Sequence, residues 1–325
     1  MAYDPKFVID NEMLTLVSET AALMERIPDA GTSKHIRLRQ EGRIRSIHSS
    51  VAIEGNRLSL EKVTDIINGK RVIGDPKDIL EVKNAQKAYD RMDEHDPFSI
   101  NDLLTAHGMM MNGTADSPGE FRDCGVGVYK GGEPIHIAPE HEDVPHLMNE
   151  LMEWIRDSDT HPLIKGCIFH CRFEYIHPFV DGNGRMGRLW HTLIISRWRH
   201  AFSHLPIESW INLRRRDYYD SLTEADNGNI TVFIKFMLSM IRMAADEFAD
   251  EILYEEKSAL NIEKQISEMI SGRPGITAGG MARLLEVNIR TVKRYLSSMT
   301  KKGIIVRVGS DKSGHWEIIR SEADL

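Results

Sequence analysis

The sequence predicts a mainly α-helical fold that contains a β-hairpin and is followed by a small α+β unit. Apolar side chains recur at helical spacing in residues 163–176, 189–198 and 230–254, and this period indicates helices with a buried face. Residues 126–137 instead form two short alternating runs around a Lys-Gly-Gly-Glu-Pro turn at 130–134. That pattern is typical of a β-hairpin.

Other segments extend the helical prediction. Most of residues 1–256 has helical apolar spacing, and Ser59 and Ser99 precede two of the helices as N-cap residues. Near residue 255 we expect one helix to end and another to begin. Besides the helices at 163–176, 189–198 and 230–254, we expect helices at 58–67, 79–92, 101–111, 141–156, 214–222, 260–270, 277–285 and 288–302.

Length and composition limit the class of protein. A chain of 325 residues with 41% apolar content can bury one large core and a smaller one. Its net charge of −8 argues against general affinity for nucleic acid or for anionic membranes. We expect no signal peptide. We also expect no membrane helix, because the apolar stretch at residues 230–245 is interrupted by Lys235 and Arg242. Three cysteines cannot form a disulfide framework, so we expect a cytoplasmic protein.

Residues 177–188 carry the strongest functional signal, His-Pro-Phe-Val-Asp-Gly-Asn-Gly-Arg-Met-Gly-Arg. The run joins two predicted helices, and the second should begin near Asn183 or Gly184. The N–H groups at a helix N-terminus are unpaired and can hold phosphate, and glycine lets the backbone approach a ligand closely. Arg185 and Arg188 lie three residues apart, so both can reach an anion on one helix face.

This run is similar to the active-site motif of Fic proteins, His-Pro-Phe-x-Asp/Glu-Gly-Asn-Gly-Arg-x-x-Arg, and it matches every specified position. Most Fic enzymes transfer AMP from ATP to a hydroxyl side chain of a protein. The resemblance implies that His177 is the general base and that Asp181 holds Mg²⁺. It further implies that the anion hole is lined by Gly182, Asn183 and Gly184. The outer phosphates of ATP would be held by Arg185 and Arg188.

An upstream segment is similar to the inhibitory helix of Fic proteins, Ser/Thr-x-x-x-Glu-Gly/Asn. The helix is expected over about 33–55, with Ser50 and Glu54 on one face and Gly55-Asn56 in the left-handed turn that closes it. By this resemblance Glu54 pairs with Arg188 and blocks the site of the ATP γ-phosphate. The predicted hairpin, at 125–138, resembles the flap that covers the active site and aligns the target segment in Fic proteins.

The C-terminal part differs in charge and pattern. Residues 272–325 hold ten Lys or Arg against five Asp or Glu, a balance of about +5 that leaves about −13 for the rest. Residues 277–296 have helix-turn-helix character, and residues 304–319 resemble the hairpin of a winged helix. Arg290, Lys293 and Arg294 are candidate DNA contacts on the second helix, although winged helices also serve as protein-interaction modules.

We therefore divide the chain into an N-terminal helical region with the inhibitory helix (1–95), a Fic catalytic core (96–256) and a winged helix-turn-helix (257–325). The resemblance implies a protein adenylyltransferase that uses ATP with Mg²⁺, acts on a Ser, Thr or Tyr hydroxyl of a target or of itself, and is inhibited by Glu54. Removal of AMP is left open, as is a homodimer. The alternative is a nucleotide-sensing, DNA-binding regulator or a toxin–antitoxin component.

Overall fold

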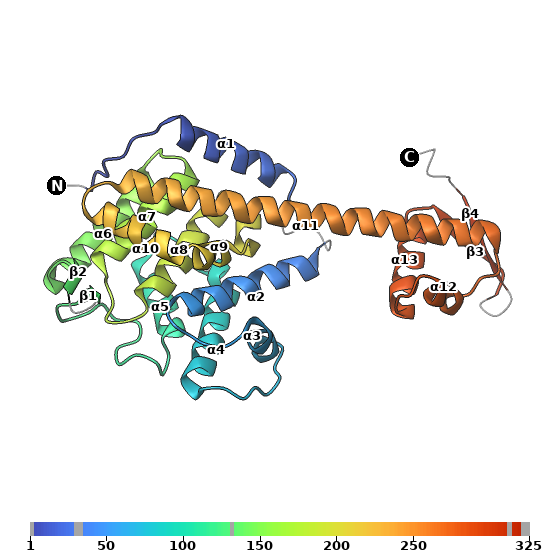
Figure 1. The fold of residues 1–325 in the computed structure, drawn as a ribbon, viewed down its shortest axis with the longest axis horizontal. Helices are drawn as coiled ribbons and strands as arrows, with labels where there is room; N and C mark the ends of the chain where they lie inside the picture. Colours follow the sequence, from blue (N-terminus) through green and yellow to red (C-terminus); the bar gives the residue numbers. More distant parts are fainter. Residues whose placement is uncertain (1–2, 29–34, 131–132, 311–313, 320–325) are drawn as a thin grey trace. The chain divides into compact units, whose positions relative to one another are not determined.

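The computed structural model describes residues 3–28, 35–130, 133–310 and 314–319 (Figure 1). The chain divides into two compact units, Met1–Ala249 and Asp250–Leu325. The described part is mainly helical with two small sheets, so the predicted fold class is confirmed. Its elements are α1 Asn11–Glu25, α2 Ile36–Ile53, α3 Leu60–Ile67, α4 Pro76–Asp90, η1 Met92–Glu94, α5 Ile100–Met110, β1 Gly127–Lys130, β2 Glu133–Ile137, η2 His141–Asp143, α6 Val144–Asp157, α7 Pro162–Ile176, α8 Asn183–Ser196, η3 His200–His204, α9 Ile207–Leu213, α10 Arg215–Asp226, α11 Ile230–Gly272, α12 Ala278–Leu284, α13 Ile289–Lys301, β3 Ile305–Val308 and β4 His315–Ile318.

Helix α11 corrects one sequence prediction. Residues 230–254 and 260–270 were expected to form separate helices, but they belong to one helix, Ile230–Gly272. Residues 255–259 are Glu-Glu-Lys-Ser-Ala. This stretch contains neither Gly nor Pro and is rich in good helix formers, so nothing in it ends the helix. Among the described residues, no helix has the length and apolar content needed to cross a bilayer.

The core of the first unit lies around α7 and α8, which pack on each other. Phe169 and Phe173 of α7 and Leu189 and Trp190 of α8 are fully or almost fully buried in one cluster. Helix α2 adds Ile47 and Val51 to the same cluster. The loop between α7 and α8 holds residues 177–182 of the motif, and the remaining motif residues begin α8, so the motif is fixed on both sides by buried helices.

Local signals at the helix ends behave as predicted. The Ser59 hydroxyl accepts a hydrogen bond from the Lys62 N–H at 3.3 Å, and Ser99 accepts one from the Asp102 N–H at 3.2 Å, so both serines are N-caps. Strands β1 and β2 pair antiparallel within the predicted hairpin. Cys167 and Cys171 are buried core residues.

The second unit has its own small core. Helices α12 and α13 pack on each other, and strands β3 and β4 pair antiparallel. Apolar residues from α11, both short helices and β3 fill this core; they include Ile266, Ile270, Met281, Val292, Leu296, Met299 and Ile305. The two helices and the hairpin lie where the sequence predicted them.

Helix α2 approaches η3 so closely that only glycine fits at residue 42. A Cβ atom built on Gly42 would overlap the carbonyl oxygen of His204. Ser46, one turn further along α2, donates to the carbonyl of Leu205 at 3.3 Å. The glycine therefore sets how deeply α2, and with it Glu54 at its C-terminal end, sits against the rest of the unit.

We predict that Gly42→Ala loosens α2. The new methyl group meets a backbone atom that cannot rotate away, and such overpacking costs about 1–3 kcal/mol. The measurement is the denaturation midpoint of the full chain, with Gln40→Ala, at an exposed position of the same helix, as the control. Equal midpoints for the two variants would contradict this account of the close approach.

Candidate active site

His177 occupies the C-cap of α7 in a left-handed backbone conformation, with φ at 49°. Its N–H still donates to the carbonyl of Phe173 at 2.9 Å, so the helix ends at this residue. A non-glycine residue with positive φ is uncommon and costs energy, which the surroundings must supply. The Nδ1 atom lies 3.3 Å from the carbonyl of Glu174. This bond leaves Nε2 as the nitrogen that can meet a substrate.

Arg122 fixes the end of α7 beneath His177. Its guanidinium donates to the carbonyls of His177 at 2.8 Å, Ile176 at 3.3 Å and Pro139 at 2.5 Å. The last carbonyls of a helix have no partner within the helix, and here one arginine supplies it. Because Pro139 follows the hairpin, the same side chain also ties the end of the hairpin to the motif.

The turn after His177 is held by Asn183 and His107. The Asn183 side chain accepts from the Phe179 N–H at 2.9 Å and donates to the Phe179 carbonyl at 2.8 Å. The His107 ring stacks on Phe179 with centroids 3.6 Å apart, and its Nε2 lies 3.0 Å from the Asp181 carbonyl. His107 Nδ1 accepts from the Gly119 N–H, so Nε2 carries the proton and donates. Burial lowers the pKa of His107 to about 4, which keeps this ring neutral.

The glycines at the N-terminus of α8 let neighbouring side chains approach its backbone closely. Gly182 has a φ of 88°, and a Cβ there would lie 2.6 Å from the sulfur of Met111. A Cβ on Gly184 would overlap Oε1 of Glu54. The N–H groups of the first helical turn have no acceptor within the helix and carry partial positive charge. This turn is therefore suited to an anion.

Arg188 is almost wholly buried and is held by the end of α2. Its Nη2 donates to Oε1 of Glu54 at 2.8 Å and to the carbonyl of Ser50 at 3.0 Å, and its Nε donates to the Ser50 hydroxyl at 3.2 Å. Burial alone would lower the pKa of Arg188, but the Glu54 carboxylate raises it above its ordinary value. Nη1 has no acceptor among the described residues. The guanidinium thus has one donor nitrogen left for another anion.

The turn that delivers Glu54 differs slightly from prediction. Gly55 takes the left-handed conformation, with φ at 98°, but Asn56 does not. Asn56 instead uses its side chain, which donates to Glu81 of α4 at 2.9 Å and accepts from the Leu58 N–H at 3.1 Å. An asparagine that bonds to nearby backbone is common in turns.

Arg185 points away from the cavity that holds the other motif residues. Its Nη2 donates to Oδ1 of Asp181 at 3.0 Å, and its Nη1 lies 3.5 Å from Oε1 of Glu81. Only 5% of its side chain is exposed, against 51% for Asp181. In this state Arg185 bridges the motif to α4, so the predicted phosphate contact would require it to turn.

One cavity of about 280 Å³ collects most of the predicted site. The predicted residues that line it are His177, Asp181, Gly182, Asn183, Gly184, Arg188 and Glu54. Ser50 is buried behind Arg188, and Arg185 lies outside the lining. Tyr218 and Tyr219 both line the cavity, and the hydroxyl of Tyr218 lies 2.9 Å from Nε2 of buried His170.

Three titratable cavity residues were not found by sequence reasoning: Glu174, His136 and Asp226. Glu174 lies three residues before His177, with its Oε2 4.0 Å from His177 Nδ1, so its helical spacing was the available signal. His136 and Asp226 are 90 residues apart in the sequence and meet only in the fold, with Nδ1 and Oδ2 2.8 Å apart.

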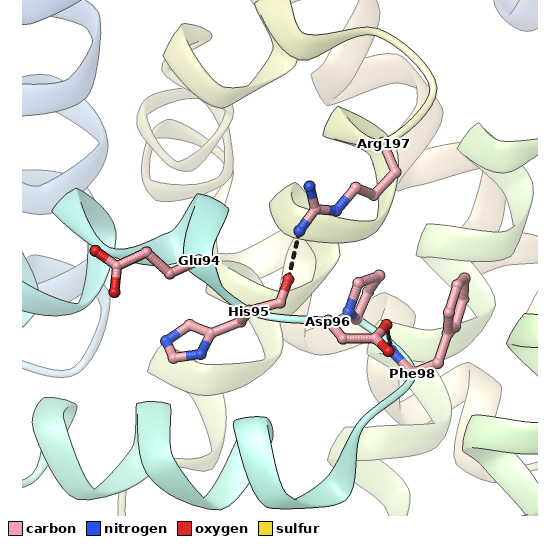
Figure 2. Close-up of a pocket in the computed structure, with 6 residues that line it drawn as sticks. Glu94, His95, Asp96, Phe98 and Arg197 are labelled. Atoms are coloured by element: carbon pink, nitrogen blue, oxygen red, sulfur yellow. Dashed lines mark hydrogen bonds between the residues drawn. The ribbon is translucent and has the colours of Figure 1, made fainter.

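A second hollow, of about 470 Å³, lies beside η1, the start of α5 and the C-terminal end of α8 (Figure 2). Arg197 reaches across it and donates to the carbonyl of His95. Trp190 of α8 donates to the carbonyl of Pro97 at 2.9 Å. These bonds fasten the segment between η1 and α5 to α8, so we assign this hollow a structural role.

The candidate DNA contacts lie in the other unit. Arg290, Lys293 and Arg294 are exposed on α13. Arg294 stacks over Tyr295 with its guanidinium carbon 5.4 Å from the ring centroid. These cations therefore share one helix and are open to solvent.

A histidine, a helix N-terminus and a buried arginine thus line one cavity of a helical fold, an arrangement suited to phosphate. The profile of the Fic/DOC family matches residues 97–195. A Fic family protein from Desulfovibrio desulfuricans G20, solved by crystallography, is 36% identical, with a TM-score of 0.73 over 97% of this chain and 98% of that chain. The chain belongs to the Fic family.

Curated relatives extend the similarity to animals. A protein adenylyltransferase Fic of Nematostella vectensis is 27% identical over 253 residues, covering 74% of this chain and 56% of the relative. One of Culex quinquefasciatus is 32% identical over 231 residues, covering 67% and 43%. The chain thus spans about half the length of these relatives. The solved Fic-1 of Caenorhabditis elegans shares the fold, with a TM-score of 0.61 at 23% identity over 75% of this chain and 72% of that chain.

We predict that Glu174 makes stability depend on pH. Burial raises the pKa of Glu174 to about 8, so the folded protein keeps this proton while the unfolded chain releases it near pH 4.5. Stability is therefore lost as pH rises from about 5 to 8. Residue 174 cannot titrate in Glu174→Gln. The melting temperature of this variant relative to that of the parent should therefore rise as pH increases from about 5 to 8. Glu61→Gln, at an exposed position of α3, is the control, and a constant difference for Glu174→Gln would contradict the buried proton.

Proposed function

We propose that the protein transfers AMP from ATP to a hydroxyl side chain of a protein. The observation that carries this proposal is the single cavity shared by His177, the N-terminus of α8 and Arg188. A base, an anion-binding helix end and a cation are what a phosphoryl-type transfer needs, because its catalysis rests on positioning and charge stabilisation. The names of the curated relatives support the same activity.

His177 would act as the general base. Burial lowers the pKa of His177, so at neutral pH the imidazole is free to accept a proton. With Nδ1 turned to the Glu174 carbonyl, Nε2 takes the proton of the attacking hydroxyl. The hydroxyl oxygen bonds to the α-phosphorus as the bond to the β-phosphate breaks, and pyrophosphate leaves with the electron pair.

The phosphates would lie on the N-terminal turn of α8. The backbone N–H groups of Asn183 and Gly184 can hold the α- and β-phosphate oxygens, and the Arg188 guanidinium would hold an outer phosphate once the Glu54 carboxylate has moved away from it. Asp181 is the candidate Mg²⁺ ligand, because its half-exposed carboxylate lines the cavity and Mg²⁺ is usually held by one or two carboxylates together with substrate phosphates. When bound, Mg²⁺ would neutralise phosphate charge.

Glu54 would keep this activity low. Its carboxylate accepts a hydrogen bond from Nη2 of Arg188 and lies over Gly184. It would therefore fill the space of the γ-phosphate and hold the donor nitrogen that this phosphate needs. Two like charges in a partly buried cavity also repel each other strongly. ATP would then bind in a pose that does not align its α-phosphate with His177.

AMP removal is a second proposed activity of the same cavity. The Glu54 side chain is 32% exposed and shares the lining with His177, so the carboxylate could orient a water where the target hydroxyl would otherwise lie. The anion site and the base would serve both directions. Transfer remains the primary proposal.

We predict that Glu54→Gly raises AMP transfer roughly tenfold or more, a change of about 1.4 kcal/mol, because the carboxylate no longer holds Arg188 and no longer repels the triphosphate. Adding His177→Ala should then reduce transfer by about 100-fold to 10,000-fold through loss of the base. The measurement is protein-linked AMP from labelled ATP in the parent, in each variant and in the double variant. Glu61→Gly is the matched control. No label in any variant would favour the alternative, a nucleotide sensor with its output elsewhere.

We also propose that the second unit is a winged helix that binds DNA. The exposed cations of α13 support this, since a second helix with outward Lys and Arg is the element that enters the major groove in helix-turn-helix modules. The excess of Lys and Arg over residues 272–325, within a chain of net charge −8, supports it as well.

The DNA proposal predicts a steep salt dependence. Replacing Arg290, Lys293 and Arg294 together by Ala should weaken duplex binding and reduce the slope of log Kd against log salt by roughly three, since each lost phosphate contact removes about one unit. Lys257→Ala with Lys264→Ala, at exposed positions of α11, is the control. Absence of duplex binding at low salt would identify the unit as a protein-interaction module instead.

A further inference from the structure

His136 joins the hairpin to two helices through both nitrogens of its ring. It lies on β2, opposite Val128 of β1. Its Nε2 is 2.9 Å from the carbonyl of Tyr175 on α7, and its Nδ1 is 2.8 Å from Oδ2 of Asp226 on α10. Only 10% of the His136 side chain and 22% of the Asp226 side chain are exposed. The hairpin is thus attached to the motif helix and to α10 by one buried side chain.

The two partners determine the charge of this ring. A carbonyl oxygen has no proton to donate, and an ionised carboxylate only accepts. Each nitrogen of His136 must therefore carry a hydrogen, which makes the ring an imidazolium. Burial alone would lower the pKa of His136, but the Asp226 carboxylate and the Tyr175 carbonyl raise it above its ordinary value.

This cation lies next to the proposed catalytic base. The ring centroids of His136 and His177 are 6.3 Å apart, and both side chains line the same cavity. The other charged or titratable groups that face His177 are Glu174 on its own helix, Arg122 beneath it and Glu54 from α2. His136 itself faces Asp226 and Glu174. Asp226 lines the same cavity and, through its ion pair with His136, partly compensates the charge of this ring.

We propose that His136 is a positioning residue that fastens the hairpin over the cavity and sets a fixed positive charge beside His177. The inference deepens the proposed function and rests on it for its catalytic meaning. A cation at this distance disfavours a second proton on His177, so the base stays neutral and ready to accept the hydroxyl proton. Because the same bonds hold β2 in place, the hairpin and the protonation state of the base are coupled.

The test measures His177 directly. The pKa of His177 is followed by NMR titration in the full chain carrying Glu54→Gly, with the His177 signal identified by its loss in His177→Ala. Replacing His136 by Gln removes the charge and keeps a side chain that can hydrogen-bond. We expect the pKa of His177 to rise by about half a unit to one unit, the size that one charge at this distance produces in a partly solvated site. His146→Gln, which removes a histidine exposed on α6, should leave the titration unchanged.

Two further measurements separate the possible failures. The acid limb of the pH profile of AMP transfer should move to higher pH by the same amount in His136→Gln. Asp226→Asn should move both quantities in the same direction by less, and it serves in place of His136→Gln if that variant does not fold. Transfer by Glu54→Gly with no movement of the His177 pKa or of the acid limb would overturn this inference alone. A shifted pKa with no transfer at any pH would support the charge coupling and overturn the proposed function.

Discussion

The interaction on which the rest of the site depends is the hold of α2 on Arg188. A guanidinium with 1% of its side chain exposed needs partners on all sides, because an unpaired buried charge costs several kcal/mol. Ser50 and Glu54 supply the partners of Nε and Nη2, and they stand at the end of a helix whose depth is set by Gly42 against η3. A carboxylate at this point satisfies the arginine and excludes a phosphate from it by the same contact. In the proposed function, stability of the resting state and inhibition would therefore have one physical cause.

The loop between α7 and α8 can serve as a site because hydrogen bonds from side chains hold its backbone in one conformation. Arg122 satisfies the end of α7, Asn183 closes the turn around Phe179, and the neutral ring of His107 supports Asp181. The N–H groups at the start of α8 have no acceptor within the helix, and Nη1 of Arg188 is among the buried side-chain atoms without a partner in the described part of the chain. An anion with several oxygens matches these donors, which is why the geometry favours a nucleotide triphosphate over a neutral ligand.

How far the sequence predicts this site depends on how local each contact is. The motif residues lie in one run of twelve positions that covers the loop after α7 and the first turns of α8, so their convergence follows from the chain itself. The pairing of Glu54 with Arg188 was predicted only through the resemblance to Fic proteins, and the structure confirms the contact. The bond between His136 and Asp226, and the turn of Arg185 toward Glu81, depend on packing between distant helices and left no periodic signal. The missed continuity of α11 has another origin: residues 255–259 lose their apolar spacing but keep high helix propensity.

The most direct test of the central claim is a crystal structure of the parent protein with Mg²⁺ and a non-hydrolysable ATP analogue, solved beside the Glu54→Gly variant. We expect the ion pair of Glu54 and Arg188 to persist in the parent and the γ-phosphate to lie away from Arg188. In the variant, the γ-phosphate should bond to Arg188 and the α-phosphate should face Nε2 of His177. A parent structure with the γ-phosphate on Arg188 while Glu54 remains in place would contradict the account.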